Sequence, residues 1–427
     1  MAQNAISLFS SSGIGDLGLK ANGIDTIIGC ELLEERMNLF RNNYPNAKCF
    51  QGDIWMLKNE IIDYYNATYT EPPFLVLATP PCQGMSPNGM GKMLSDYRKG
   101  IRPKMDERNQ LIIPALEIIK SLRPEWIILE NVANMTNTLI YDENNKLINI
   151  IDYIKQTLGD IYCGEPAVID VVNYGVPQHR KRLFIVLSRN ENAKKVFSNR
   201  GKLLPDYTHS AEDSLFTRHW VTLREAIGEL PALRAEKGRN KVRGYSGLHK
   251  VPLLDEKKLF WVDNTKEGDT AFNNQCVNPK CGYQGNKTHG ASQDKDGINK
   301  PHTDTPLYCE KCGSLLPRPW VEDTKTGEKR LMKGFVSAYK RMKWDEPAST
   351  LTQNFQYASS DNKIHPSQSR VLSLYEGLVL QSIADYDYSF CIDRKACSDS
   401  LIRDTIGESV PPRVIDLICA YIKEISL

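Results

Sequence analysis

The sequence predicts an α/β fold: a doubly wound sheet interrupted by a second, smaller domain. Short apolar runs alternate with helical patterns up to about residue 190, a loop-rich stretch follows to residue 344, and a compact pattern returns from residue 345 to 427. Strands that alternate with helices typically form a parallel sheet covered on both faces. We therefore predict segments 1–190, 191–344 and 345–427, with the first and third in one domain.

The bulk composition excludes several classes of protein. At 427 residues, 41% hydrophobic and 25% charged, the chain suits a globular protein of two domains. Its formal net charge is only +2, so a nucleic-acid-binding face would have to gather its Lys and Arg locally. The amino terminus has no signal-peptide pattern and no apolar run is long enough to span a bilayer, so we expect a cytoplasmic protein without membrane contact.

The predicted elements follow the hydrophobic pattern in chain order. A buried strand over 5–9 leads through a Ser/Gly turn into a helix over 16–22, and a second strand covers 26–30. Further predicted strands cover 74–78, 126–129 and 182–187, and further helices cover 111–122 and 414–425.

The turn after the first strand is typical of a nucleotide site. Phe9, Gly13 and Gly15 lie in it, and glycine lets backbone amides approach a ligand. Glu31, at the end of the second strand, could accept hydrogen bonds from ribose hydroxyls, and Asp53 could accept one from an adenine amino group. A strand-end cap and a turn residue are the alternatives for these carboxylates, but together and in this order they favour an adenosine-containing cofactor.

Three groups that follow strands or precede one could meet at one pocket edge. Cys82 follows two prolines after the strand over 74–78, Glu130 follows the strand over 126–129, and Arg182 begins the last strand. A thiolate, a carboxyl group and a fork-shaped donor suit attack on an electron-poor heterocycle. A buried cysteine in a proline turn, a capping glutamate and surface arginines are the alternatives if each stands alone.

At these positions the sequence resembles the DNA (cytosine-5) methyltransferase family. Leu-Phe…Gly-Ile-Gly is similar to its first motif, Pro-Pro-Cys-Gln to its fourth, Glu-Asn-Val to its sixth and Gln-His-Arg-Lys-Arg to its eighth. Segments 106–110, 370–376 and 407–412 are similar to the fifth, ninth and tenth, and the motifs occur in family order over about 1–190 and 345–427. The resemblance implies a Rossmann-like S-adenosylmethionine-dependent methyltransferase sheet with an inserted target-recognition domain.

The resemblance also implies roles for residues. Cys82 attacks C6 of a flipped-out cytosine, Glu130 engages N3 and the exocyclic amine, and Arg182 holds O2, with Gln178 and Arg180 supporting the pocket. The residues implied in S-adenosylmethionine binding are Phe9, Gly13, Gly15, Glu31, Leu32, Asp53, Ile54, Pro80, Glu408 and Ser409. The segment after Cys82, with Gln83, Ser86 and Asn88, would close over DNA.

The chain departs from the family pattern at two positions. Asp16 stands where a second glycine is common, so contacts with the cofactor there can differ. Glu408 stands where the family usually carries Asn, which leaves the role of that side chain open.

Four cysteines in the inserted segment are spaced as metal ligands. Cys276 and Cys281 form one close pair, Cys309 and Cys312 the other, and each pair is followed by glycine. This spacing predicts a structural Zn²⁺ site in a ribbon-like module, with a redox dithiol as the alternative.

The inserted segment also carries the cations expected to contact DNA. Arg243, Lys340 and Arg341 are predicted phosphate contacts, whereas solvated surface charge is the alternative for many of the basic residues there. The whole pattern predicts a sequence-specific methyltransferase acting on double-stranded DNA, working as a monomer and partnered in some systems by a cognate restriction endonuclease. A tRNA cytosine-5 methyltransferase and a catalytically silent DNA-binding protein on the same fold remain the alternatives.

Overall fold

The computed structural model describes residues 3–81, 106–293, 299–333 and 336–427. Its centre is a seven-stranded sheet with the order β3-β2-β1-β4-β5-β9-β8. The strands are β1 (Gln3–Leu8), β2 (Ile24–Glu31), β3 (Lys48–Gln51), β4 (Leu75–Ala78), β5 (Trp126–Val132), β8 (Pro166–Asp170) and β9 (Lys181–Ser188). The predicted α/β class and each strand predicted from the apolar runs are therefore present.

The sheet is mixed rather than wholly parallel. The five strands from β3 to β5 run parallel, but β9 pairs antiparallel with both β5 and β8. The prediction of a parallel sheet was wrong for this edge, because an apolar run shows that a strand is buried without showing its direction. The antiparallel register places Arg182 opposite Val132, so the start of β9 lies beside the end of β5.

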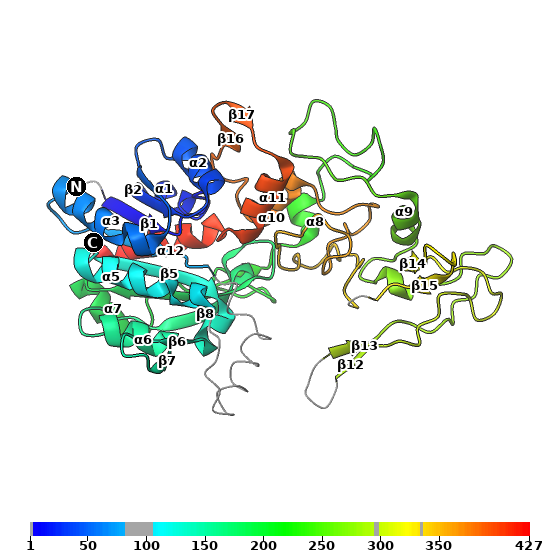
Figure 1. The fold of residues 1–427 in the computed structure, drawn as a ribbon, viewed down its shortest axis with the longest axis horizontal. Helices are drawn as coiled ribbons and strands as arrows, with labels where there is room; N and C mark the ends of the chain where they lie inside the picture. The colour runs from blue at the N-terminus through cyan, green and yellow to red at the C-terminus, as the bar shows by residue number, and fades with distance from the viewer. Residues whose placement is uncertain (1–2, 82–105, 294–298, 334–335) are drawn as a thin grey trace. The chain divides into compact units, whose positions relative to one another are not determined.

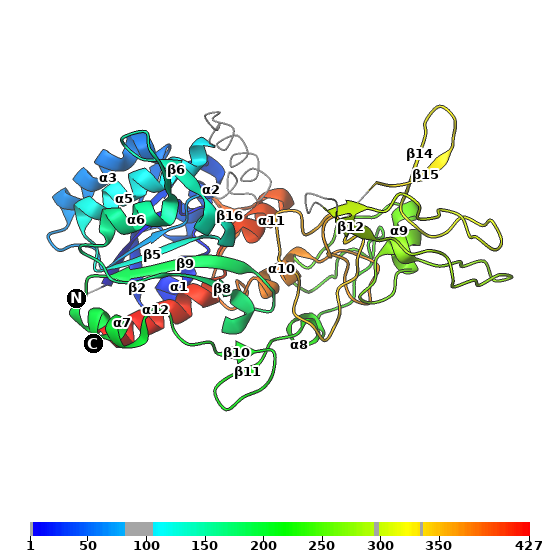
Figure 2. The ribbon, with the colours of Figure 1, turned by 90° about the horizontal axis from the view of Figure 1, so that it is seen from below.

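Helices cover both faces of the sheet (Figures 1 and 2). One face is packed by α3 (Ile54–Thr68), α5 (Ile112–Leu122) and α6 (Ile150–Leu158), and the other by α1 (Leu17–Ala21), α7 (Glu191–Arg200) and α12 (Pro412–Ser426). The sequence of α12 explains its burial, because its apolar residues recur at helical spacing and form one face. Four residues of this face are fully buried against the sheet: Val414, Ile415, Ile418 and Ile422. The remaining elements of this part are α2 (Glu34–Asn43), η2 (Glu107–Leu111), η3 (Ala133–Asn137), η4 (Val171–Tyr174), β6 (Leu139–Tyr141), β7 (Leu147–Asn149), β10 (His209–Ser210), β11 (Arg218–His219), β16 (Cys391–Ile392) and β17 (Lys395–Ala396).

The chain divides into two compact units. Unit 1 comprises residues 1–220, 382–401 and 409–427, and unit 2 comprises residues 221–381 and 402–408. The boundaries differ from those predicted: residues 191–220 stay with the sheet because Ala193, Leu203 and Leu204 pack in its core. Residues 345–381 belong instead to unit 2, where Ala358, Ile364 and Val371 join the core around Trp261.

Unit 2 has little regular structure. Its elements are α8 (Leu223–Ile227), α9 (Glu256–Asp263), η5 (Ala271–Asn273), β12 (Ala291–Gln293), β13 (Asn299–Pro301), β14 (Trp320–Glu322), β15 (Lys329–Leu331) and α10 (Leu374–Leu380); α11 (Asp399–Glu408) is divided between the units. The strands described in this unit pair only as short hairpins, so small cores and polar networks must hold it together.

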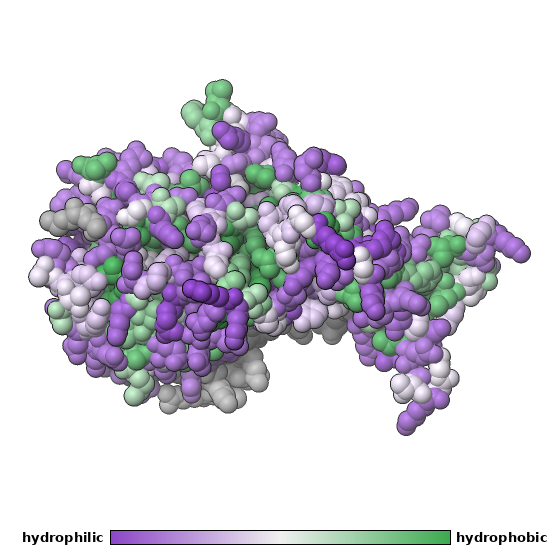
Figure 3. All heavy atoms as spheres, turned by 90° about the horizontal axis from the view of Figure 1, so that it is seen from above, coloured by the Kyte–Doolittle hydropathy of each residue, from purple (hydrophilic) through white to green (hydrophobic). Residues whose placement is uncertain are grey.

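The surface is largely hydrophilic on the face shown in Figure 3, where hydrophobic side chains form small separate areas. Among the helices that the structure describes, none combines the length and the apolar composition required to cross a membrane. Leaving the terminal Leu427 aside, the most exposed large apolar side chains among the described residues are Leu215 and Phe216 of the β10–β11 loop, at 96% and 89%.

Candidate functional site

The turn after β1 adopts a strained conformation. Phe9, Ser11 and Gly13 all have positive φ, at 59°, 46° and 80°, and non-glycine residues in that region often mark functional sites. A Cβ at Gly13 would lie 2.5 Å from the ring of Tyr44. The Tyr44 hydroxyl donates to Gly13 O at 2.7 Å and holds the turn from behind.

The predicted cofactor carboxylates lie at the same edge of the sheet, since β1, β2 and β3 are parallel neighbours. Glu31 accepts main-chain N–H groups with both oxygens, from Ser11 at 2.9 Å and from Leu33 at 2.8 Å. Asp53 caps α3 by accepting from the Trp55 amide at 3.0 Å. Leu32, which follows Glu31 in the chain, is 60% exposed and so offers an apolar side chain to a ligand at this edge.

Asp16, the first departure from the family pattern, is a buried structural residue. It is 2% exposed and accepts hydrogen bonds from the hydroxyls of Ser7 and Thr26, both at 3.0 Å. Burial raises its pKa to about 7, although the two hydroxyls act in the opposite direction. Asp16 therefore joins β1 and β2 beneath the turn.

The backbone before the predicted nucleophile is fixed by side chains of neighbouring strands. Asn131 donates to Pro80 O at 2.9 Å, and Thr79 Oγ1 donates to Phe9 O at 3.0 Å. Cys82 itself lies outside the described residues, as do Gln83, Ser86 and Asn88. The end of β4 is thereby joined both to the turn after β1 and to the end of β5.

Glu130 and Arg182 meet beside this backbone. Arg182 Nε lies 3.2 Å from Glu130 Oε1, and the side chains are only 15% and 9% exposed. Burial raises the pKa of Glu130, while the charges of Arg182 and Arg180 oppose the shift. A carboxyl group in this environment retains its proton to higher pH than an exposed glutamate, so it can donate a hydrogen bond.

Buried supports hold the rest of the predicted pocket. Arg180 is 2% exposed and donates through Nη2 to Ser409 O at 3.0 Å, while Asp170 accepts its amide at 2.8 Å. Gln178 is fully buried. The predicted residues of the eighth and tenth motifs are therefore brought together, with the main-chain oxygen of Ser409 as the contact. Asn131 and Ser409 both lie in motifs of the sequence. Their contacts, with Pro80 O and with Arg180, could not be predicted from the sequence.

Glu408, the second departure, is exposed and accepts from Gln353 Nε2 at 2.8 Å within unit 2. Glu408 directly precedes Ser409 in the chain, and the sequence did not indicate its contact with Gln353.

The four cysteines of the inserted segment converge. The Sγ atoms of Cys276, Cys281, Cys309 and Cys312 all lie within 4.8 Å of one another. Two of the separations are 3.7 Å, between Cys276 and Cys312, and 4.0 Å, between Cys281 and Cys309. Four sulfurs bound tetrahedrally at about 2.3 Å to one zinc ion would stand about 3.8 Å apart. Main-chain amides of Asn278, Tyr283 and Ser314 donate toward the sulfurs of Cys276, Cys281 and Cys312, and donors of this kind favour the charged form of a thiol.

Arg318 supports the loops that carry these cysteines, and the sequence did not single it out. Its guanidinium is fully buried and donates to Asn274 O at 2.8 Å, Lys287 O at 2.9 Å and Pro306 O at 2.7 Å. Its three acceptors lie just before the first pair of cysteines and between the two pairs. A run of Pro-Arg-Pro at 317–319 is the only local signal of this role.

The three basic residues predicted as phosphate contacts differ in exposure. Arg243 is exposed and Lys340 is half-buried. Arg341 is 4% exposed, and its guanidinium donates to main-chain oxygens of Val262, Thr265, His365 and Gln368 at 2.7–2.8 Å. The prediction that Arg341 contacts phosphate was therefore wrong, because its donors are occupied inside unit 2.

Comparison with known proteins assigns the chain to one family. The C-5 cytosine-specific DNA methylase family matches residues 3–424. Type II methyltransferase M1.HgaI of Avibacterium volantium is 30% identical over 96% of this chain and 95% of its own. Type II methyltransferase M.AgeI of Thalassovita gelatinovora is 22% identical over 95% and 96% of the two chains.

Solved structures share the fold at low sequence identity. The Entamoeba histolytica methyltransferase EhMeth superimposes with a TM-score of 0.54 and 13% identity over 99% of this chain and 98% of its own. Dnmt2 of S. pombe gives a TM-score of 0.53 and 11% identity over 100% of both chains.

Proposed function

The chain belongs to the C-5 cytosine-specific DNA methylase family and is a DNA (cytosine-5) methyltransferase, and we propose that Cys82 is its nucleophile toward a flipped-out cytosine. The observation that carries this assignment of residues is the buried Glu130–Arg182 pair beside the anchored Pro80 backbone. That pair sets a carboxyl group of raised pKa beside a planar guanidinium donor. The neighbouring Asn131 contacts Pro80, which lies two residues before the proposed nucleophile in the chain.

The proposed reaction balances through the thiolate. The Cys82 sulfur forms a bond to C6, and the C5–C6 double-bond electrons move to C5. C5 then takes a methyl group and gives its proton to a base or to water. The electrons of the C5–H bond restore the C5–C6 double bond, and the C6–S bond breaks to release the thiolate. S-adenosylmethionine, the methyl donor implied by the family, supplies an electrophilic methyl group when bound.

Glu130 and Arg182 would act on the ring opposite the nucleophile. Glu130, with its raised pKa, would donate to N3 and so increase the electron demand at C6. Arg182 would hold O2, and Arg180 with Gln178 would keep both side chains in place. Because the ring faces are stacked in a duplex, the target base must leave the stack, at a cost of a few kcal/mol.

The turn after β1 supports a site for the donor at the same edge of the sheet. Phe9, Gly13 and Gly15 would pass beside it, and Glu31 and Asp53 would receive its ribose and adenine groups. The further residues proposed to line this site are Leu32, Ile54, Pro80, Glu408 and Ser409.

The test is transfer of labelled methyl groups to duplex DNA, compared with tRNA, by the full chain. Cys82→Ala should abolish transfer, whereas Cys49→Ala, a cysteine on β3, should retain it. DNA containing 5-fluorocytosine should form a stable adduct at Cys82, because fluorine cannot leave C5 as a cation. An adduct on another residue would reject Cys82, and labelling of tRNA alone would reject DNA as the substrate.

We further propose that the four-cysteine cluster holds one structural Zn²⁺. The sulfur separations and the amide donors around the cysteines suit a tetrahedral thiolate site, and unit 2 has little other core in this segment. Elemental analysis should find one zinc per chain, lost in Cys309→Ser and kept in Cys163→Ser. Iron in place of zinc, or no metal in the wild type, would contradict the proposal.

The remaining proposals concern partners. Arg243 and Lys340 would contact DNA, and so would Gln83, Ser86 and Asn88, which the family resemblance alone supports. The relatives are named type II methyltransferases and come from bacteria, which supports a modification enzyme of a bacterial or phage restriction system. A monomeric state and a cytoplasmic location are proposed from the family resemblance alone. Co-purification with an endonuclease would test for a cognate partner.

A further inference from the structure

A basic loop in unit 2, residues 239–250, is closed at its base like a hairpin. Lys241 and Lys250 form an antiparallel bridge, and the amide of Val251 donates to Asn240 O at 2.9 Å. The side-chain amide of Asn240 donates to Val251 O at 3.1 Å. The two ends of the loop are therefore held together independently of any ligand.

The returning arm of the loop is anchored by a buried histidine. His249 is 1% exposed; its Nε2 lies 2.8 Å from Pro231 O, and its Nδ1 lies 3.1 Å from Ser373 Oγ. A carbonyl can only accept, so Nε2 carries the proton and Nδ1 accepts from the serine hydroxyl. The amide of Tyr375 also donates to Leu248 O at 3.0 Å, which ties the loop to α10 a second time.

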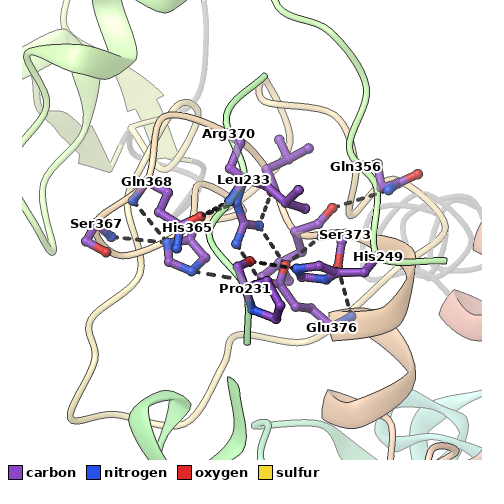
Figure 4. A network of polar contacts seen from close by, with 12 residues as sticks. Pro231, Leu233, His249, Gln356, His365, Ser367, Gln368, Arg370, Ser373 and Glu376 are labelled. Atoms are coloured by element: carbon purple, nitrogen blue, oxygen red, sulfur yellow. Dashed lines mark hydrogen bonds and ion pairs between the residues drawn. The ribbon is translucent and has the colours of Figure 1, made fainter. Parts of the chain in front are cut away.

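The anchor continues into a buried ion pair (Figure 4). Ser373 caps α10 together with Glu376, and Arg370 donates to both oxygens of Glu376 at 2.7 Å. Arg370 Nε and the amide of Leu233 share the side-chain oxygen of Gln368, each at 2.8 Å. The network thus braces the segment before the loop as well as the arm after it.

The tip of the loop is exposed, cationic and backed by aromatic rings. The ring of Tyr245 packs edge-to-face on His249 and Tyr375, with centroids 5.3 and 5.6 Å away, yet Tyr245 remains 39% exposed. Arg243 lies two residues before it and is exposed. Residues 237–254 contain no Asp or Glu, and the cations in that run are Lys237, Arg239, Lys241, Arg243 and Lys250.

We propose that this loop reads part of the recognition sequence, with Arg243 making a bidentate contact to a guanine edge in the major groove and Lys241 contacting phosphate. The inference rests on the proposed function and extends it to sequence specificity. A flexible cation suffices for a phosphate, but a base edge requires a side chain held in a defined geometry, and the braced loop provides that support. Arginine is the side chain whose fork matches the two acceptors of guanine.

The test uses methylation of a duplex library with randomised sequence, read as 5-methylcytosine. The wild type defines the site. Arg243→Ala should relax the preference for guanine at one position and slow cognate methylation by about 5- to 150-fold, the range of one bidentate base contact. Lys241→Ala should weaken DNA binding at all sequences and reduce the slope of log affinity against log salt by about 1.

Arg239→Ala is the matched control, because Arg239 lies at the base of the same loop and pairs with Glu236 at 3.4 Å. It should leave the methylated sequences unchanged. If Arg243→Ala methylates the same sequences as the wild type, at a lower or an unaltered rate, the base contact is refuted. A wild type that methylates no DNA in the library would instead refute the proposed function and leave this loop unassigned to it.

Discussion

Replacing Arg341 by alanine should destabilise unit 2 without changing the contribution of phosphate contacts to DNA affinity. The guanidinium joins its own segment to two others, to 262–265 through the oxygens of Val262 and Thr265, and to 365–368 through those of His365 and Gln368. A buried acceptor left without a donor costs about 1–3 kcal/mol. Four such oxygens at the low end of that range, with water entering the space left by the side chain, give a loss of about 4 kcal/mol.

Hydrogen exchange of the full chain is the suitable assay, because unfolding of two units need not be a single transition. A loss of about 4 kcal/mol corresponds to exchange roughly 1,000-fold faster in the segments that Arg341 joins, α9 and residues 338–342. Amides of β1 and β4, in unit 1, serve as the internal reference. Arg341→Lys should fall between the wild type and alanine, since an ammonium has fewer donors and no fork.

Arg243→Ala provides the control for charge, because Arg243 is exposed and its removal should leave exchange unchanged. The reasoning is refuted if Arg341→Ala keeps wild-type protection while its DNA affinity loses salt dependence. Those two results together would show that Arg341 contacts phosphate, as its place in a basic run predicts.

Three other outcomes follow from the buried groups. Asp16→Asn should remove one pH dependence of the free energy of unfolding. The pKa of Asp16 is about 7 in the folded protein against an ordinary value of 3.8. The stabilising contribution of its neutral carboxyl group is therefore complete below pH 3.8 and is lost as the pH rises through 7. Relative to the wild type, the variant should therefore gain up to about 4 kcal/mol between pH 4 and 8 in denaturant titrations, and parallel pH profiles would contradict this. Glu130→Gln should slow methyl transfer by about 10²- to 10⁴-fold and should remove the loss of rate that the wild type shows as pH rises through the raised pKa of Glu130; an identical pH profile in both proteins would exclude Glu130 as the proton donor. A strong zinc chelator should increase exchange in residues 274–318 while the strands of the central sheet stay protected, and uniform loss of protection would show that the cysteine cluster is not a local module.

The sequence predicted the strands of the central sheet and the residues at their ends well because these signals are local. Glu130 and Arg182 sit in short motifs at strand ends, and the strands themselves are uninterrupted apolar runs such as 126–129. The cysteine cluster was predicted for a similar reason, since ligand spacing within each pair is a property of neighbouring residues. The position of Cys82 relative to these groups stays a prediction.

Features decided by distant contacts could not be predicted. Arg341 lies in a basic run, and only acceptors up to 79 residues away in the chain reveal that it is buried. The direction of β9 depends on the connection through β8, a short and half-exposed strand that leaves no apolar run. The boundary at residue 220 likewise depends on Leu203 and Leu204 packing against a helix from the other end of the chain.

The discontinuity of unit 1 has a consequence for synthesis of the protein. Residues 3–188 contain the seven strands that the structure describes in the central sheet, but α12, which packs on one face of it, is translated only after the intervening segment. At about 10 residues per second, the ribosome needs roughly 20 s to make the intervening 200 or so residues. For that interval the nascent sheet exposes the apolar surface that α12 later covers, although α1 and α7 already pack on the same face. We expect the nascent chain to depend on chaperones or on the ribosome surface. Ser409, whose carbonyl oxygen accepts from Arg180, also follows unit 2 in the chain, so a product truncated before unit 2 lacks this support of the proposed pocket. Incomplete translation products would thus be unable to methylate DNA indiscriminately.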